Sequence, residues 1–308
     1  MDNTKSTSLR IAEVNDLRQS ENWAKYLHKL GWNTYKTKSN VALHVRKTIL
    51  GGMAKIQRPP KLSVKNIEEI QNICKKENIT FITIEPNLKQ NLALLKDYKY
   101  KSSVNFLVPT RTIFIDLTLT EKELWNNLTN SCKYSINRAK RENNKVNVTS
   151  RVTDHDLAEF VMVQRESANK NKFMVEKLED LIYKRDIFGT ELLMAKAYNN
   201  NNEICGINIY LAYKNNVWYM HGGTSKAGRK SKAGYLLVWE SLRFLKNNNY
   251  EFLDLEGVDD DRVPSTLSTW GGFSHFKEKF GGITVEYPLP QVKFNNKILS
   301  FFRKRSAV

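Results

Sequence analysis

The sequence predicts an α/β (α+β) fold of two similar domains, whose sheets are mixed and mainly antiparallel. Three observations support this prediction. Helical and strand-like hydrophobic periods alternate along nearly the whole chain. The same order of elements (helices, an antiparallel meander, a helix and a further strand) occurs twice. At 308 residues the chain is long enough for two buried cores. We place the domains at residues 1–147 and 148–308.

The first half of the chain predicts two helices and four strands. The helices have apolar residues at three- and four-residue spacing and cover residues 19–30 and 63–77. The strands cover residues 41–49, 80–84, 104–108 and 112–117. Two glycines break the chain at 51 and 52, and the segment 55–62, with Pro59 and Pro60, is expected to be a loop.

The middle and second half continue the pattern. Thr120 and Glu123 form a capping box that opens a helix. A basic helix over 131–143 and a strand over 146–151 follow. The remaining helices are expected over 155–170, 175–187 and 232–247, and the remaining strands over 191–198, 204–213, 217–223 and 250–256.

The chain is strongly basic, with 49 Lys and Arg against 32 Asp and Glu and a formal net charge of +17. Residues 1–150 hold most of the surplus, with 26 basic against 13 acidic residues. Such a surplus favours a polyanionic partner: nucleic acid, anionic lipid or a pyrophosphate-bearing substrate. A generally Lys- and Asn-rich proteome would give the same composition.

The cysteines indicate neither a disulfide framework nor a metal site. Cys74, Cys132 and Cys205 lie far apart and form no Cys-x-x-Cys pair. The first residues lack the apolar core of a signal peptide, and no window approaches eighteen consecutive apolar residues. We therefore expect a cytoplasmic protein with no metal and no cofactor.

Four ordered motifs run through the chain. They are Trp23-Ala24-Lys25, the strand 112–117 with the basic helix that follows, the segment from Trp218 to Gly223, and Phe276-Lys277 to Gly282. Over roughly residues 19–290 they resemble the Fem family of tRNA-dependent peptidoglycan-bridge aminoacyltransferases. The resemblance implies two tandem GNAT-like acyltransferase domains, the first binding the precursor and the second holding the Phe-Lys motif. Residues 155–187 leave room only for two ordinary helices, so the chain resembles the compact, FemABX-like type without a coiled-coil arm.

The resemblance implies transfer of an amino acid from aminoacyl-tRNA to the amine of a peptidoglycan-precursor stem peptide, as in interpeptide bridge formation. An aminoacyl ester is already activated, so the enzyme must only position the substrates, remove a proton and stabilise an oxyanion. The expected partners are aminoacyl-tRNA and a muramyl pentapeptide precursor, either lipid-linked or UDP-linked. The amino acid and its acceptor position stay open. We expect a monomer, with the tail over 293–305 either packed or in contact with the inner membrane face.

Two residues are expected to be catalytic. Lys277 matches the Phe-Lys lysine, which the resemblance places at the tRNA acceptor end and the developing oxyanion; the alternative is a surface lysine on a turn. Glu85 ends a strand before Pro86, where the family has an acidic residue that orients the amine or accepts its proton. The alternative for Glu85 is an acidic turn residue.

Four further residues are expected to bind substrate. By resemblance, Lys25 contacts the phosphates of the precursor, and Phe276 anchors the backbone around the Phe-Lys motif. Tyr219 and His221 alternate on a strand and should face the same side, where they would line the precursor pocket. They could equally be a core tyrosine and a structural histidine.

Basic residues on one helix are expected to meet tRNA phosphates, although exposed basic helices are common. They are Lys133, Arg138, Lys140 and Arg141. A second basic residue for the precursor phosphates is expected between 165 and 180, where Lys170 and Lys172 are both candidates.

Two other functions are compatible with the sequence. An acyl-CoA-dependent GNAT-type N-acyltransferase would need a glycine-rich loop, but the counterpart from Arg229 to Gly234 has Lys232 where the first glycine belongs. A non-catalytic RNA-binding protein would suit the basic surplus, but it would leave the Phe-Lys-x-x-Phe-Gly-Gly ending unexplained.

Overall fold

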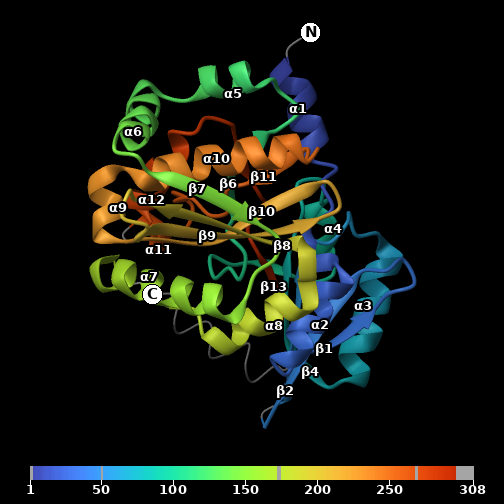
Figure 1. Cartoon of the computed structure of the whole chain (residues 1–308). Coiled ribbons are helices and arrows are strands. Elements are labelled where there is room, and N and C mark those ends of the chain that lie inside the picture. Colours follow the sequence, from blue (N-terminus) through green and yellow to red (C-terminus); the bar gives the residue numbers. More distant parts are fainter. Residues whose placement is uncertain (1–2, 50, 172–174, 268–269, 296–308) are drawn as a thin grey trace. The chain divides into compact units, whose positions relative to one another are not determined.

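The computed structural model describes residues 3–49, 51–171, 175–267 and 270–295 (Figure 1). The chain divides into two compact units, each containing one sheet. The seven-stranded unit comprises Met1–Ile11, Thr112–Asp259 and Ser268–Val285, and the six-stranded unit comprises Ala12–Arg111, Asp260–Leu267 and the chain from Glu286 onward. No helix among the described residues is both long enough and apolar enough to span a membrane.

The six-stranded sheet has the order β1-β2-β3-β4-β13-β5. Its strands are β1 (Asn33–Lys36), β2 (Ala42–Thr48), β3 (Gly51–Gln57), β4 (Ile79–Glu85), β5 (Lys101–Ser102) and β13 (Gln291–Phe294). Strands β3 and β4 are parallel, and the other neighbours pair antiparallel.

Helices of this unit are η1 (Leu17–Gln19), α2 (Glu21–Lys29), α3 (Val64–Lys76), α4 (Leu92–Asp97) and α11 (Pro264–Leu267). A capping box at Ser63 opens α3. Helix α3 buries Ile67, Ile70 and Cys74 in one core with alternate residues of the central strands. Because β-strand side chains alternate between faces, these strand residues share one face of the sheet, and Leu95 of α4 joins the same core.

The seven-stranded sheet has the order β12-β6-β11-β10-β9-β8-β7. Its strands are β6 (Arg111–Asp116), β7 (Lys145–Thr149), β8 (Leu192–Tyr198), β9 (Ile204–Tyr213), β10 (Asn216–Thr224), β11 (Phe252–Asp254) and β12 (Ile283–Glu286). Strands β10 and β11 are parallel, whereas β6–β11 and the β7–β10 meander are antiparallel. Both sheets are thus mixed and mainly antiparallel, which confirms the predicted fold class.

Nine helical segments lie among the described residues of this unit. They are α1 (Asn3–Ile11), α5 (Glu121–Asn127), α6 (Asn130–Arg141), α7 (Asp154–Asn171), α8 (Leu178–Phe188), η2 (Gly189–Glu191), α9 (Lys226–Ser231), α10 (Ala233–Asn247) and α12 (Gly271–Glu278). Helix α10 packs on one face of the sheet with α6 beside it, while α7 and α8 cover the other face (Figure 1). The expected capping box of Thr120 and Glu123 is confirmed at the start of α5.

Two expected elements are wrong. Strand β3 runs from Gly51 to Gln57, so the glycines begin a strand and the expected loop over 55–62 starts too early. Residues 104–108 form no strand. The helix expected over 232–247 is confirmed as α10, and Lys232, with a left-handed backbone (φ 62°), separates it from α9, which was not expected.

The expected division at residues 147 and 148 differs from the two units. Residues 112–147 belong to the seven-stranded unit because β6 pairs with β11. The chain then returns to the six-stranded unit, where β13 pairs with β4 and β5. Long-range strand pairing, rather than position along the chain, decides which unit a strand joins.

Candidate functional site

Lys277 lies in the last turn of α12, half-buried, and its Nζ donates a hydrogen bond to the carbonyl oxygen of Gly257 at 2.8 Å. Burial lowers the pKa of Lys277 to about 8, against the opposing effects of the Glu256 and Asp254 carboxylates. At pH 7 about nine-tenths of the side chain is therefore still an ammonium. The site thus holds a cation whose proton is easier to remove than that of an ordinary lysine.

Aromatic rings surround this ammonium. The Lys277 Nζ lies 5.1 Å from the ring centroid of Phe273 and 5.7 Å from that of Tyr219, both within cation–π range. Phe276 does not face the ammonium in this way: its ring packs against Tyr235 and Phe280 at 4.9 and 5.2 Å. Phe276 is therefore an anchor that fixes α12 on the core, as expected for the backbone around Lys277.

The two glycines after Phe280 are required by the path of the chain. Gly281 and Gly282 have positive φ angles of 74° and 93°. A Cβ on Gly281 would lie 2.6 Å from the carbonyl oxygen of Asn127, and one on Gly282 would lie 2.5 Å from that of Phe114. The tight turn thus follows Lys277 rather than containing it, and β12 begins directly after the turn.

Two carboxylates, those of Asp254 and Glu256, act on Lys277. Asp254, at the end of β11, is 5% exposed; it accepts hydrogen bonds from the Thr112 hydroxyl and from the backbone N–H of Glu256. Glu256 is half-buried and adopts a positive φ of 58°. The sequence motif contained both residues but gave them no chemical role; the signal was a pair of acidic residues two positions apart at a strand end.

The expectation that Tyr219 and His221 face the same side is wrong. The pairing of β10 with β9 shifts between them, so that Tyr219 is opposite Tyr210 while His221 is opposite Ile209. This β-bulge reverses the alternation of the side chains. Tyr219 packs in the core under α10 and donates a hydrogen bond to Asn208 at 2.9 Å, whereas His221 lies against Phe160 of α7.

His221 is held in a network of its own. The Lys184 Nζ donates a hydrogen bond to its Nε2 at 2.8 Å, and Glu176 lies 3.5 Å from both side chains. Burial and the Lys184 charge hold the pKa of His221 well below its ordinary value. His221 is therefore a neutral imidazole that accepts a hydrogen bond from Lys184, separate from the Lys277 site.

Glu85 is 1% exposed at the end of β4. Its Oε1 accepts hydrogen bonds from the backbone N–H groups of Leu107 and Val108, the latter at 2.7 Å. Its Oε2 is buried and has no hydrogen-bond partner among the described residues. Burial raises the pKa of Glu85, while the Arg58 charge and the two amides oppose that rise. The carboxylate thus anchors the segment that sequence reasoning had assigned to a strand.

Basic groups that the sequence did not single out lie around Glu85. Arg58 stacks on the Tyr287 ring at 3.6 Å and donates a hydrogen bond to the carbonyl oxygen of Pro86 at 2.8 Å. Lys55 lies 4.4 Å from the Trp32 ring centroid, and burial lowers its pKa to about 8 against the effect of Glu85. The periodic pattern of the sequence showed these residues as ordinary strand and loop positions.

Lys25 lies on the exposed face of α2, opposite the buried Trp23, Tyr26 and Leu27. Lys25 and Glu85 belong to the six-stranded unit, whereas Lys277 belongs to the seven-stranded unit. Within each unit, the structure brings Lys277 close to Tyr219 but leaves Lys25 in solvent.

The expected tRNA-binding cations all lie on α6, and most have intramolecular contacts. Arg138 pairs with Glu142 at 2.8 Å, and Lys140 pairs with Glu240 at 3.4 Å. Lys133 donates a hydrogen bond to the Asn126 carbonyl oxygen, and Arg141 lies 6.0 Å from the ring of the exposed Tyr134. The side chain of Lys170, all of Lys172 and the tail from 296 lie outside the described residues.

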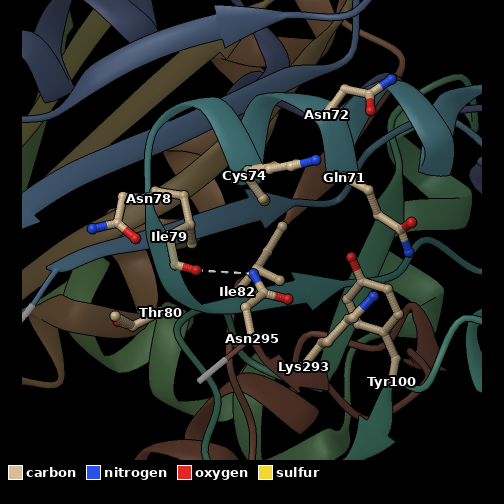
Figure 2. Close-up of a pocket in the computed structure, with 11 residues that line it drawn as sticks. Gln71, Asn72, Cys74, Asn78, Ile79, Thr80, Ile82, Tyr100, Lys293 and Asn295 are labelled. Carbon is tan, nitrogen blue, oxygen red and sulfur yellow. Dashed lines mark hydrogen bonds between the residues drawn. The ribbon is translucent and has the colours of Figure 1, made fainter. Parts of the chain in front are cut away.

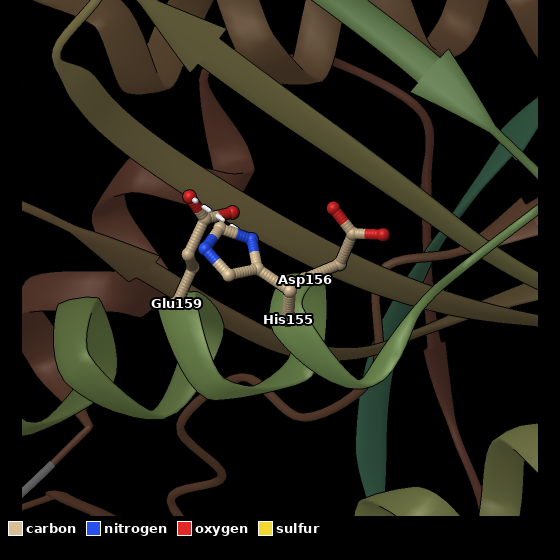
Figure 3. Close-up of side chains that lie close together, drawn as sticks. All are labelled: His155, Asp156 and Glu159. Atoms are coloured by element: carbon tan, nitrogen blue, oxygen red, sulfur yellow. Dashed lines mark ion pairs between the residues drawn. The ribbon is translucent and has the colours of Figure 1, made fainter.

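A cluster with metal-ligand chemistry occurs at the start of α7, where ligand atoms of His155, Asp156 and Glu159 lie within 4.8 Å of one another (Figure 3). Both carboxylates, however, accept hydrogen bonds from the buried Lys196 ammonium. Burial opposes ionisation of Asp156, yet bonds from Lys196 and Thr153 hold its pKa below the ordinary value. The cluster is therefore an ion-pair network in which the ammonium supplies the positive charge.

The loop that would cradle a CoA pyrophosphate is closed on itself. Lys232 adopts the left-handed conformation that a glycine would favour, and its N–H donates a hydrogen bond to the preceding helix at Arg229. Helix α10 then starts without a side-chain cap. An amide that ends α9 in this way does not point to a phosphate.

Comparison with known proteins agrees with this architecture. Residues 176–289 match the model of the FemAB family. A crystal structure of FemX superposes with a TM-score of 0.80 at 13% identity, covering 98% of each chain. The structure of L-PGS from Bacillus licheniformis superposes with a TM-score of 0.66 at 13% identity and covers 98% of this chain and 95% of that chain. A tandem GNAT protein from the clavulanic acid biosynthesis pathway superposes with a TM-score of 0.51 at 9% identity and covers 83% of this chain and 79% of that chain. No curated protein matches the sequence.

At such low identities the structural likenesses show the fold, which is shared with FemX and with a tandem GNAT protein. The family match is more specific because its residues include β10, α10, β11 and the whole of α12 with Lys277. Residues 176–289 are thus similar to the FemAB family, and the chain as a whole has a FemX-like fold.

Proposed function

We propose that the protein transfers an aminoacyl group from aminoacyl-tRNA to the amine of a peptidoglycan-precursor stem peptide. The match of residues 176–289 to the FemAB family supports an acyltransferase. The single observation that carries the proposal is Lys277, a half-buried cation between aromatic rings, inside the segment that matches the family. A cytoplasmic location and a monomeric state belong to the same proposal.

In the proposed reaction the amine attacks the carbonyl carbon of the ester. A C–N bond forms, the amine loses a proton, and the ester C–O bond breaks to release the tRNA hydroxyl. The intermediate places negative charge on the carbonyl oxygen, and the Lys277 ammonium, whose position is fixed by its bond to Gly257, has further N–H groups to donate to it. A fixed donor of this kind contributes about 10²- to 10³-fold in rate.

The six-stranded unit is proposed to hold the precursor. Lys25, which is exposed on α2, supplies a cation for the precursor phosphates. Because the oxygens of the Glu85 carboxylate are enclosed, Glu85 is proposed to act on the amine indirectly. Its carboxylate anchors residues 106–109, and the shape of this segment would position the amine. Direct proton transfer to Glu85 is the alternative that a glutamine variant tests.

Helix α6 is proposed to contact tRNA chiefly through Arg141. Its guanidinium and the neighbouring Tyr134 ring are both exposed, which suits a phosphate and a stacked base. Lys133, Arg138 and Lys140 would add positive charge, although part of it is offset by Glu142 and Glu240.

The test is a transfer assay on the full chain with a pool of charged tRNAs and, separately, UDP-linked and lipid-linked muramyl pentapeptide. The expected result is a mass gain of one amino acid residue on the peptide, abolished by prior RNase treatment. Gain that needs acyl-CoA instead would establish the N-acyltransferase alternative. Retained tRNA binding with no gain on either precursor would favour a non-catalytic RNA-binding protein.

A further inference from the structure

A cavity of about 620 Å³ opens in the six-stranded unit, outside both groups of residues described above (Figure 2). Helix α3 borders it with Cys74 and Lys75, β4 with Ile79 and Ile82, and β13 with Lys293. The volume lies in the range of small-molecule sites. The cavity lies at the amino end of β4, whereas Glu85 ends the strand about 20 Å away at 3.3 Å per residue.

Two donors without a protein acceptor among the described residues line this cavity. Tyr100 is 3% exposed and lines the cavity, and its hydroxyl has no hydrogen-bond partner within the described parts of the chain. The half-buried Lys293 lies 5.7 Å from the Tyr100 ring centroid, and none of the described carboxylates pairs with its ammonium. The Tyr100 hydroxyl is not among the buried atoms that lack a partner, so it is open to the cavity and can donate to a molecule bound there.

The charged side chains that line the cavity are all cationic. The cavity-lining residues include two lysines, Lys75 and Lys293, and no Asp or Glu. Burial lowers the pKa of Lys293, as expected for a cation that lacks a counter-charge. Burial raises the pKa of the Cys74 thiol to about 12, so Cys74 stays neutral and cannot serve as that counter-charge.

The other groups that line the cavity indicate which further chemical groups a bound anionic molecule would carry. Four residues with side-chain amides also line the cavity: Gln71, Asn72, Asn78 and Asn295, whose Nδ2 also donates a hydrogen bond to the Ile79 carbonyl oxygen. The floor is apolar, since Ile79 and Ile82 are 4% and 1% exposed. Amides beside an apolar floor suit a molecule with hydroxyl groups and a small carbon skeleton.

We propose that this cavity is a second binding site, for a small polyhydroxyl molecule bearing one phosphate or carboxylate group. The anion accepts hydrogen bonds from the Tyr100 hydroxyl and the Lys293 ammonium, and the amides contact the hydroxyl groups. Nothing in the proposed transfer reaction uses these residues, so the site goes beyond that function.

The test is isothermal titration of the full chain at low salt with four probes: glucose 6-phosphate, gluconate, inorganic phosphate and glucose. Glucose 6-phosphate or gluconate is expected to bind more tightly than inorganic phosphate and at least tenfold more tightly than neutral glucose. The stronger of the first two identifies the anionic group. If neither binds, or if glucose binds equally well, the proposal is overturned.

Matched variants locate the binding. Lys293→Gln should weaken binding about tenfold, and Tyr100→Phe, which removes one hydroxyl and nothing else, about threefold. Lys96→Gln, an exposed lysine of α4 outside the cavity lining, makes the same charge change and should have no effect. Equal weakening by Lys96→Gln and Lys293→Gln would overturn the proposal. Lys277→Met should bind the probe normally, which separates this site from the proposed transfer function.

Discussion

At the scale of single residues, the environment of Lys277 determines how the proposed reaction responds to pH. Its pKa is about 8 in the folded protein and about 10.4 in an unfolded chain. If the ammonium is the active form, its fraction falls as pH rises through 8, even though the attacking amine becomes more nucleophilic over the same range. The rate should therefore pass through a maximum near pH 8 and then decline.

Lys277→Arg tests this origin of the decline. An arginine stays charged above pH 12, so the variant should lose activity overall but should show no decline near pH 8. The measurement is kcat as a function of pH, from pH 6.5 to 9.5, for both proteins. Profiles with the same shape would show that another group titrates.

Glu85 anchors a backbone segment and is also a candidate proton acceptor, and different substitutions separate these two roles. Removing its carboxylate leaves the buried amides of Leu107 and Val108 without an acceptor, so Glu85→Ala should lower the free energy of unfolding by about 2–4 kcal/mol. Glu85→Gln retains a carbonyl acceptor and should retain most of the transfer rate. Denaturant unfolding and the transfer assay measure the two effects. A folded Glu85→Gln protein with a loss of 10² or more in kcat would instead make Glu85 the proton acceptor.

At single residues, the sequence predicted which side chains belong to the candidate site better than it predicted what surrounds them. It singled out Lys277, but the Tyr219 ring and the Gly257 carbonyl near that lysine come from other segments, and only the Phe273 ring shares its helix. It placed Tyr219 and His221 on one face because a regular strand has a period of two. A one-residue bulge reverses that period and leaves no mark in the hydrophobic pattern.

At the scale of elements, the turn after α12 should be more sensitive to substitution than the helix itself. Gly281→Ala and Gly282→Ala each force a Cβ into a backbone carbonyl at a positive φ, so each should cost about 2 kcal/mol or more of folding free energy. Gly272→Ala is the matched control, since no atom lies within 4 Å of its added Cβ and alanine favours a helix. Thermal unfolding should rank the control at or above the unchanged protein. Equal losses for all three would contradict the role of the turn.

Elements with strong periodicity were predictable and short ones were not. Helix α3 lies within one residue of its expected bounds because its apolar spacing and its cap agree. The apolar run over 104–108 was expected to be a strand, but its amides turn toward a buried carboxylate instead. Strands β5 and β13, of two and four residues, are too short for a period to be recognised.

At the scale of the whole molecule, duplication of the fold was predictable but the path of the chain between units was not. The repeated order of elements indicates two sheets, and both exist. Which strand joins which sheet depends on pairings such as β4 with β13, more than two hundred residues apart along the chain. The hydrophobic pattern of a strand indicates whether the strand is buried, but it does not indicate with which other strand it pairs.

The basic surplus predicts strongly salt-dependent tRNA binding. Each phosphate neutralised steepens the plot of log K against log salt by about 0.7 to 0.9. Arg141→Ala should reduce the slope by that amount, because Arg141 is exposed without a carboxylate partner among the described residues. Arg138→Ala, on the same helix but paired with Glu142, should change the slope less. Filter binding from 50 to 300 mM salt measures both; equal slopes for all three proteins would exclude α6 as a tRNA contact.

The most direct test of the account compares two lysines two positions apart. Lys277→Met removes the half-buried ammonium, whereas Lys279→Met removes one that contacts only the Tyr235 ring and hydroxyl among the described residues. Single-turnover transfer from charged tRNA to the precursor should fall about 10²- to 10³-fold in Lys277→Met and less than about threefold in Lys279→Met, with both proteins folded. Transfer at an unchanged rate in folded Lys277→Met would contradict the central claim.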